Sequence, residues 1–381
     1  VITDETKTFV NDKLTLEKNG AIASTVVVKN TENAAIFVLG TDYITSFNDE
    51  GYLVVTRLST GTIAENGAVK ISYSYLDTTK VTDNDVIGGV NVNGDYSGLE
   101  LINSIFPKFR LVPGQILAPK YSLKPAVAAI MKAKASNINQ HFRAISIVDI
   151  DTTEVTKYTD APAWKNDNNY VSTYEVVCFP KVKLGDDTFH LSTHLAGLIC
   201  QVDGNNEDIP YTSPSNKSLQ CNSAVIANGK EVELAPDQAA YLNGEGIVTA
   251  LNFVGGWKAW GNRTSIYPSV TDPKDSFIPL RRMFNWISNT LTLTFWQKID
   301  FPVNRRLIET VLDSANIWLN GLAARQFILG GRIEFREDEN PTTDLMDGII
   351  RFHVYVTPPT PAREIDFILE YDPEYLKTLF G

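Results

Sequence analysis

The clearest hydrophobic pattern of the chain lies in its C-terminal region. Between Arg305 and Leu329 apolar residues recur at the three- and four-residue spacing of a helix, and polar residues occupy the opposite side. The apolar positions are Leu307, Ile308, Val311, Leu312, Ala315, Leu319 and Leu322. Gly330 and Gly331 follow, where a helix is expected to end. The pattern predicts a long amphipathic helix over residues 305–329.

Strand patterns follow this helix. Ile333 and Phe335 share one face of a predicted strand whose other face is charged, and a second strand is predicted for Ile349–Val356. Three prolines then interrupt the chain: Pro358, Pro359 and Pro361. Beyond them Ile365–Tyr371 alternates again as a strand does. Chain ends are usually polar, so this apolar strand is expected to have a partner that covers it.

Residues 1–85 have an all-β pattern. Short segments rich in β-branched and aromatic residues are separated by turn signals, and in Val69–Leu76 apolar residues alternate with polar ones. The other predicted strands are Ala35–Leu39, Tyr43–Phe47 and Tyr52–Leu58. Alternation of this kind is typical of an antiparallel sheet with one solvated face. We expect a small sandwich or barrel over residues 1–85.

From Gly114 the chain alternates between strand and helix patterns. Ala144–Ile150 is a nearly continuous apolar run, as expected of a strand that is covered on both faces. The other predicted strands are Gln115–Ala118, Tyr174–Lys183 and Ile247–Val254, and the predicted helices are Leu123–Lys134, Phe189–Gln201 and Ala235–Leu242. These β-α-β units predict a central α/β domain over residues 86–265, followed by an α+β domain over 266–381. The fold class is therefore multi-domain α+β.

Composition and charge restrict the functions that the chain can have. The chain has 381 residues and a formal net charge of -11, which argues against broad nucleic-acid binding because such binding usually needs a basic face. No run of about 18 apolar residues is present, so we expect no membrane insertion. Three cysteines without a CxxC spacing (Cys178, Cys200 and Cys221) indicate buried reduced thiols, although a disulfide between two of them stays open.

Two histidines are the strongest candidate for metal chemistry. His190 and His194 would share one face of the predicted helix, a spacing that suits zinc when further ligands are present. Asp186 and Asp187 lie nearby, but Leu191 stands where a metalloprotease of this pattern needs Glu. An incidental pair on a structural helix is the simpler interpretation. A metal-dependent hydrolase centred on His190 and His194 is kept as an alternative.

Two carboxylates lie at the end of a predicted buried strand. Asp149 and Asp151 occupy a place where α/β enzymes hold catalytic groups. No nucleophile elbow and no cofactor fingerprint accompanies them, so capping of the chain is the simpler role. His141 and His353 have no triad signature around them. We therefore predict no enzyme, no catalytic, cofactor-binding or metal-binding residue, and no cofactor.

Two basic pairs flank an aromatic stretch in the C-terminal region. They are Arg281, Arg282, Arg305 and Arg306, and the aromatic residues between them are Phe284, Trp286, Phe295, Trp296 and Phe301. Basic residues interleaved with aromatic ones can hold single-stranded nucleic acid. Packing of an amphipathic helix with exposed arginines is the simpler interpretation, and we predict no direct nucleic-acid contact.

Several short runs resemble the C-terminal region of contractile phage tail sheath proteins, a family related to the sheaths of R-type bacteriocins. The runs are Arg332–Arg336, Asn340-Pro341, Asp347–Phe352, Thr357–Pro361, Glu364-Ile365 and Glu370–Asp372, together with Trp260–Thr264 further upstream. The resemblance extends from about Gly88 to the end of the chain. It is weaker over residues 1–85, where sheath proteins often carry an inserted outer module.

The resemblance implies a structural subunit that polymerises helically around a tail tube. Contraction of the polymer would drive the tube through the host cell envelope for genome ejection. The implied partners are copies of the same chain, the tail tube protein, and the baseplate and tail terminator proteins. The implied location is the tail of a virion or prophage particle that is assembled in the bacterial cytoplasm. The sequence does not separate a phage tail from a bacteriocin or a secretion device.

In this family extended N- and C-terminal arms link the subunits by strand exchange. The C-terminal candidate strand here presents Ile365, Phe367, Leu369 and Tyr371 on one face, with Pro358, Pro359 and Pro361 as its linker. The alternative is that this strand pairs within its own subunit. The resemblance also makes Arg281, Arg282, Arg305 and Arg306 candidate contacts to other subunits or to the tube.

Two further expectations concern the beginning of the chain. The N-terminal arm and the first core strands that the family leads us to expect do not precede Val1, so we expect this form to be a fragment that does not assemble normally. An alternative function also rests on this region: the 1–85 module could belong to a surface binding or adhesion protein.

Overall fold

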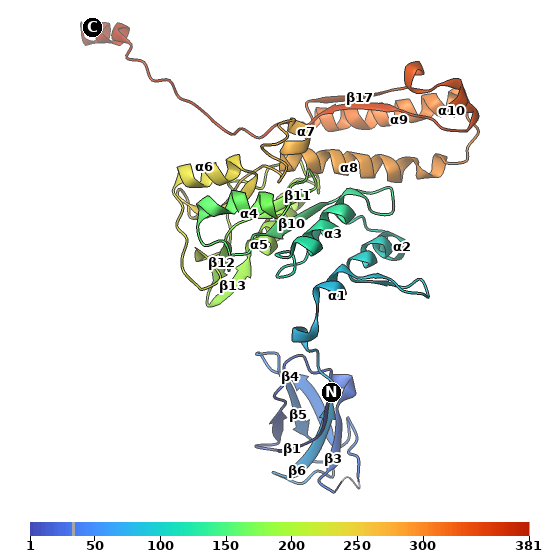
Figure 1. The fold of residues 1–381 in the computed structure, drawn as a ribbon, viewed down its shortest axis with the longest axis vertical. Helices are drawn as coiled ribbons and strands as arrows, with labels where there is room; N and C mark the ends of the chain where they lie inside the picture. Colours follow the sequence, from blue (N-terminus) through green and yellow to red (C-terminus); the bar gives the residue numbers. More distant parts are fainter. Residues whose placement is uncertain (33–34, 381) are drawn as a thin grey trace. The chain divides into compact units, whose positions relative to one another are not determined.

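The computed structural model describes residues 1–32 and 35–380 and has a mixed α+β fold (Figure 1). The chain divides into two compact units, Val1–Thr82 and Asp83–Gly381. Within the described residues no helix combines the length and the apolar content that a membrane span requires.

The N-terminal unit is built from two antiparallel sheets of three strands each. One has the order β1 (Ile2–Thr8), β6 (Ala68–Tyr73) and β3 (Val27–Asn30), and the other has the order β2 (Lys13–Thr15), β5 (Leu53–Arg57) and β4 (Tyr43–Phe47). Alternate residues of β6, such as Val69 and Ile71, are buried in a shared apolar core with Phe9. The all-β prediction for this region is confirmed.

The strands at the beginning of this unit differ from the sequence prediction. The predicted strand at 35–39 is wrong, because Ile36 forms only an isolated bridge to Lys29. Strands β1, β2 and β3 were not predicted. In β1 the run of polar residues between Ile2 and Thr8 hides the alternation that identifies a strand.

A five-stranded sheet forms the centre of the second unit. Its order is β16 (Trp257–Trp260), β15 (Ile247–Asn252), β11 (Glu175–Cys178), β10 (Ile145–Asp149) and β9 (Gln115–Leu117). Strands β9, β10, β11 and β15 are parallel, and β16 is antiparallel to β15. Every residue of β10 and β11 is buried, as the continuous apolar run of β10 predicts.

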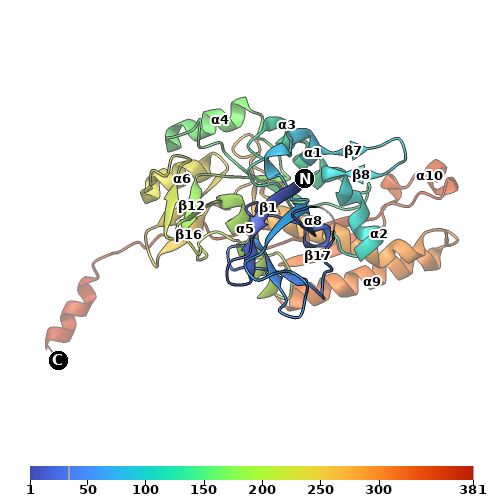
Figure 2. The same cartoon turned by 90° about the horizontal axis from the view of Figure 1, so that it is seen from below.

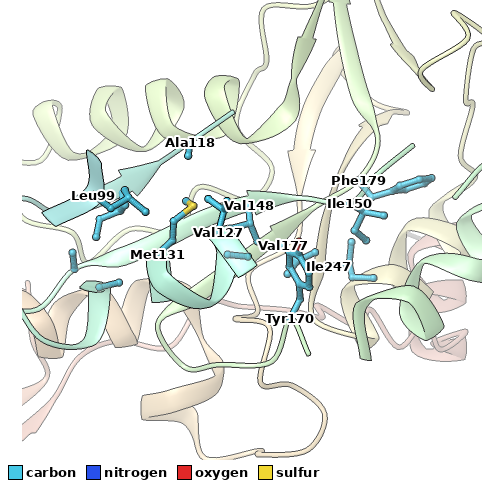
Figure 3. Close-up of a cluster of buried hydrophobic side chains, with 14 of the residues drawn as sticks. Leu99, Ala118, Val127, Met131, Val148, Ile150, Tyr170, Val177, Phe179 and Ile247 are labelled. Carbon is cyan, nitrogen blue, oxygen red and sulfur yellow. The ribbon is translucent and has the colours of Figure 1, made fainter. Parts of the chain in front are cut away.

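Helices cover both faces of this sheet. On one face Val148 and Val177 pack with Val127 and Met131 of α3 (Pro125–Ser136), and Figure 3 shows this cluster. On the other face Ile147 packs in a cluster with residues of α5 (Leu191–Gly204). The remaining short helices of this region are α1 (Asp83–Ile87), α2 (Ile105–Phe109), α4 (Ala161–Asp167) and α6 (Pro236–Gly244). The predicted β-α-β core is confirmed.

Smaller sheets surround the central one. Strands β13 (Asp187–His190), β12 (Lys181–Leu184) and β14 (Ser223–Val225) form an antiparallel sheet, and β7 (Gly89–Val90) pairs with β8 (Tyr96–Ser97). The single strand predicted over 174–183 is wrong, because the chain forms β11 in one sheet and β12 in another. Short 3-10 helices are η1 (Ala23–Thr25), η2 (Thr78–Lys80), η3 (Gly98–Ser104), η4 (Tyr158–Asp160), η5 (Trp296–Lys298), η6 (Glu337–Glu339) and η7 (Pro373–Phe380).

The C-terminal region is organised by two long helices that lie side by side (Figures 1 and 2). They are α8 (Ile278–Phe295) and α9 (Arg305–Ala324), preceded by α7 (Pro273–Ser276). The Asn304 side chain accepts a hydrogen bond from the Leu307 backbone N–H at 2.9 Å and so caps α9. Strands β17 (Gly330–Glu334) and β18 (His353–Thr357) follow, with α10 (Thr342–Met346) between them.

The helix predicted over 305–329 ends earlier, at Ala324. Gln326 has a left-handed backbone with φ 64°, and this turn directs Phe327 and Ile328 into the core between α8 and α9. The apolar residues that extended the predicted helix therefore belong to the turn. Residues 365–371 form no strand in this subunit.

Candidate functional site

The two-stranded sheet of the C-terminal region has an open side. Strands β17 and β18 are antiparallel, with Arg332 opposite Tyr355 and Ile333 opposite Val354. No third strand joins this sheet among residues 1–32 and 35–380. Unpaired strand edges readily accept a further strand, and proteins usually cover or interrupt them.

The free edge of β17 is blocked by a side chain of α9. The Asn316 amide accepts a hydrogen bond from the Ile333 backbone N–H at 3.0 Å and donates one to the Ile333 carbonyl at 3.2 Å. Ile333 thus directs its backbone groups away from β18. Residues opposite each other in an antiparallel pair share this orientation, so Val354 directs its own backbone groups away from β17. The edge of β18 is the one that can accept a strand.

An apolar groove of about 580 Å³ lies beside the same sheet. Its lining comes from the end of α8, the loop of residues 296–304, the start of α9 and the strands. The apolar lining residues are Leu291, Phe295, Ile299, Phe301, Val303, Leu307, Val311, Ile333, Ile350, Phe352 and Val354. Ile299 and Phe301 are 65% and 54% exposed. Exposed apolar surface of this kind marks interaction sites.

The predicted intersubunit strand lies in an uncovered part of the chain. Ile365, Phe367, Leu369 and Tyr371 are between 72% and 94% exposed. Within the described residues, the hydrogen bonds and ion pairs of residues 364–380 join residues of that same segment. The alternative that this segment pairs within its own subunit is therefore not realised in the described structure. Its partner in a neighbouring subunit remains a prediction.

The three linker prolines lie where the packed chain ends. Pro358 is buried, Pro359 and Pro361 are half-buried, and the side chains that follow are exposed. Proline fixes φ and donates no backbone hydrogen bond, so a proline-rich stretch stays extended without joining a sheet. Their role as a linker remains a prediction.

Two of the four candidate contact arginines are buried inside the subunit. Arg281 forms an ion pair with Asp275 at 2.8 Å, and Arg282 donates a hydrogen bond to Asp203 at 3.0 Å. Their guanidinium groups are thus occupied within the subunit, contrary to the role of outward contacts. Arg305 and Arg306 are exposed, although Arg305 pairs with Glu309 at 2.6 Å. Only this second pair remains available to a partner.

The two histidines do not share a helix face. His190 ends β13 and precedes the first residue of α5, whereas His194 lies within α5. No group of three or more His, Cys, Asp or Glu side chains in the described part of the chain could hold a metal ion. The structural basis of the metal-hydrolase alternative is therefore wrong, because a hairpin strand takes the place of the first helical turn.

Asp149 caps a helix, as the sequence interpretation holds. Its carboxylate accepts hydrogen bonds from the Ser192 backbone N–H at 2.9 Å and from Ser192 Oγ at 2.5 Å. Burial raises the pKa of Asp149 to about 6, and the hydrogen bonds from Ser192 oppose that shift. His190 Nδ1 lies 3.5 Å from the same carboxylate. Asp151 accepts hydrogen bonds from Thr153.

The three cysteines are free thiols, and they differ in burial. Cys178 is buried, Cys221 is half-buried and Cys200 is exposed. The prediction of reduced thiols agrees with this arrangement. The prediction that all three thiols are buried is correct for Cys178 alone.

Sequence reasoning missed Asn316 and the loop residues of the groove. Asn316 lies on the polar side of an amphipathic helix, and nothing in its sequence context signals a hydrogen bond to a strand. The loop residues did carry a signal. Ile299, Phe301 and Val303 are apolar residues in a connection between two helices, where polar residues are expected.

Known proteins with a related sequence are tail sheath proteins. The chain is 30% identical over 376 residues to the tail sheath protein of Burkholderia phage BcepMu, covering 94% of this chain and 76% of that protein. It is 23% identical to a putative prophage major tail sheath protein of Pseudomonas aeruginosa strain UCBPP-PA14, covering 81% and 78%. No family model matches the chain.

Solved structures of contractile systems have a related fold. The sheath complex of an extracellular contractile injection system, PVC, in its contracted state superposes with a TM-score of 0.59 at 18% identity, covering 74% of this chain and 77% of that chain. A chain of the anti-feeding prophage baseplate gives a TM-score of 0.57 at 19% identity, covering 74% of each chain. The fold is thus of the class found in contractile injection systems.

The sequence relationship identifies the protein family within this fold class. The chain belongs to the tail sheath protein family. The resemblance stated from its sequence motifs is confirmed. These relatives favour neither the adhesion protein nor the hydrolase, and nothing in them indicates enzyme activity.

Proposed function

We propose that this chain is a structural subunit of a contractile tail sheath that polymerises helically around a tail tube. Contraction drives the tube through the cell envelope of the host for genome ejection. Membership of the tail sheath family supports this function. Identical subunits that are joined through two different surfaces, by a contact that does not close into a ring, form a helix. An uncovered terminal segment and an open sheet are two such different surfaces.

The link between subunits is strand addition at the edge of β18. Residues 365–371 of one copy pair with this edge in a neighbouring copy, and Ile365, Phe367, Leu369 and Tyr371 cover the apolar groove beside it. The observation that carries this proposal is the match between an exposed, alternating apolar segment and a sheet with one blocked and one open edge. Backbone hydrogen bonds supply affinity, and the groove supplies specificity.

A linked strand suits a lattice that changes its arrangement. Side-chain contacts between subunits must break when the subunits rotate and slide, but a paired strand remains bound while the linker containing Pro358, Pro359 and Pro361 reorients. The extended lattice is kinetically trapped, and its conversion to the contracted one needs no nucleotide. A gain of a few kcal/mol per subunit sums over many copies to a large driving force.

The same proposal assigns the parts of the subunit and its partners. Residues 1–85 form an outer all-β domain, 86–265 a central α/β domain and 266–381 the sheath core with its terminal arm. Its partners are copies of itself, the tail tube protein, and the baseplate and tail terminator proteins. Arg305 and Arg306 are candidate contacts to these partners. The particle is a virion tail that is assembled in the bacterial cytoplasm, and contact with membrane or nucleic acid is not part of this role.

Electron microscopy of the complete natural protein tests the proposal. Striated tubes or polysheaths are the expected products, and a variant that ends at Pro361 is expected to give only dispersed particles. Dispersed particles from the complete protein under all assembly conditions would contradict the sheath function. Tubes from the shortened variant would contradict the strand link alone.

A further inference from the structure

The end of the chain carries a second apolar element that the strand link does not use. Helix η7 (Pro373–Phe380) follows the proposed strand directly. Its residues Tyr375, Leu376 and Leu379 are 74%, 48% and 74% exposed. Leu376 and Leu379 are three residues apart, so they lie on the same side of a 3-10 helix. An apolar side on a short terminal helix is unstable in water without a surface to cover it.

The loop between α8 and α9, residues 296–304, presents a matching surface. Trp296, Ile299, Phe301 and Val303 are all exposed, and the last three line the groove beside the sheet. Lys298 and Asp300 lie among them, and neither side chain forms an ion pair within the described residues. In η7 Glu374 and Lys377 pair with each other at 3.5 Å, next to its apolar residues. Loop and helix are therefore both apolar surfaces that carry one charge of each sign.

The position of the groove fixes the direction of the added strand. Asp347, Gly348 and Ile350 line the groove and precede β18, so the groove extends past the N-terminal end of that strand. A segment that runs antiparallel to β18 would place Tyr371 at this end. The eight residues of η7 would then continue directly onto the loop of residues 296–304. A parallel segment would carry η7 to the opposite end of β18.

We propose that η7 of one copy docks on the 296–304 loop of a neighbouring copy and that the preceding strand is added antiparallel to β18. This inference rests on the proposed strand link and gives it a direction and a second contact. The occupant is a second copy of this chain, because the contact is continuous with the strand that the same copy donates. In the described structure Tyr375, Leu376 and Leu379 of η7 are exposed and so do not occupy the groove of their own subunit.

Two peptides test the contribution of η7 separately from the strand. The acceptor is a variant that ends at Pro361, since residues 362–379 are exposed and contribute nothing to the packed core. Fluorescence anisotropy would compare a labelled peptide of residues 362–381 with one of residues 362–372. We expect the longer peptide to bind about tenfold more tightly. Equal affinities would overturn the docking of η7 and leave the strand link standing, whereas no binding by either peptide would overturn both.

Substitutions in the acceptor locate the contact. Trp296→Asp is expected to remove the advantage of the longer peptide and to leave the affinity of the shorter one unchanged, because Trp296 belongs to the loop but does not line the groove that the strand covers. Phe253→Asp is the matched control, because Phe253 is an exposed aromatic residue outside this loop. If the longer peptide keeps its advantage with Trp296→Asp, or loses it equally with Phe253→Asp, η7 docks elsewhere and the proposal is overturned.

Discussion

The central sheet and the C-terminal sheet of the second unit differ in how far their faces and edges are covered within one subunit. Strands β10 and β11 are buried along their whole length, with helices over both faces and a hydrogen-bonded strand on each side. The sheet of β17 and β18 has one covered face, one edge blocked by Asn316 and one open edge beside an exposed groove. The central sheet is complete within one copy. The C-terminal sheet is completed, in our proposal, by a second copy.

This contrast predicts that substitutions in the terminal segment change assembly without changing folding. Phe367→Asp is expected to abolish tubes of the complete natural protein, because a carboxylate would have to enter the apolar groove. The free energy of unfolding should change by less than about 0.5 kcal/mol, since Phe367 is exposed in the subunit. Electron microscopy and denaturant unfolding measure the two effects.

Ile368→Asp is the matched control for this substitution. Ile368 is equally exposed, but in an alternating strand its side chain points away from the groove. Tubes should therefore form with Ile368→Asp. If both substitutions abolish tubes, the alternation of the segment does not determine assembly, and the strand link is wrong.

Substitutions in the central sheet are expected to lower the stability of the subunit. Ile147 of β10 is fully buried in a cluster with residues of α5, so Ile147→Ala should lower the free energy of unfolding by about 3 kcal/mol. Ile365→Ala, a truncation of the same side chain in the exposed segment, is its control and should leave stability unchanged. Chemical denaturation of both variants checks this. A similar loss in both would mean that the terminal segment is packed within its own subunit.

The same contrast explains what the sequence could predict. Three patterns are local and could be recognised from the sequence: the apolar run of β10, the apolar stripe of α9 and the alternation at 365–371. Whether a predicted strand is realised depends on a partner, and residues 365–371 have none within the described subunit. The hydrogen bonds of Asn316 and the groove depend on contacts between segments that are distant along the chain. His190 was misplaced because its hairpin strand runs directly into α5 without an intervening loop.

Closed packing in the central sheet also buries a titratable group. Glu175 of β11 is fully buried, and burial raises its pKa to about 7 although Lys132, Ser265 and Lys165 oppose the shift. The folded state therefore holds a proton that the unfolded state releases above its ordinary pKa near 4.5. The free energy of unfolding should fall as pH rises from about 4.5 to about 7, by up to about 3 kcal/mol.

Glu175→Gln isolates this contribution from other groups. Asp149, whose pKa is also raised, adds a loss of the same sign, whereas His190, whose pKa burial lowers to about 4, adds the opposite one. The difference in stability between Glu175→Gln and the unaltered protein removes both. That difference should grow in favour of Gln between pH 4.5 and pH 7, as measured by urea unfolding at a series of pH values. A difference independent of pH would show that the Glu175 proton is bound equally in both states.

The smallest expected effect concerns the blocked edge of β17. Asn316→Ala leaves the backbone N–H and carbonyl of Ile333 without their hydrogen-bond partner, which should cost about 1–2 kcal/mol of unfolding free energy. It also opens a second edge, so an acceptor that ends at Pro361 should bind more than one copy of the 362–381 peptide. Asn320→Ala, one turn further along the exposed side of α9, is the control. Peptide stoichiometry by titration calorimetry measures the effect, and a single site in both variants would mean that Asn316 does not restrict strand addition to β18.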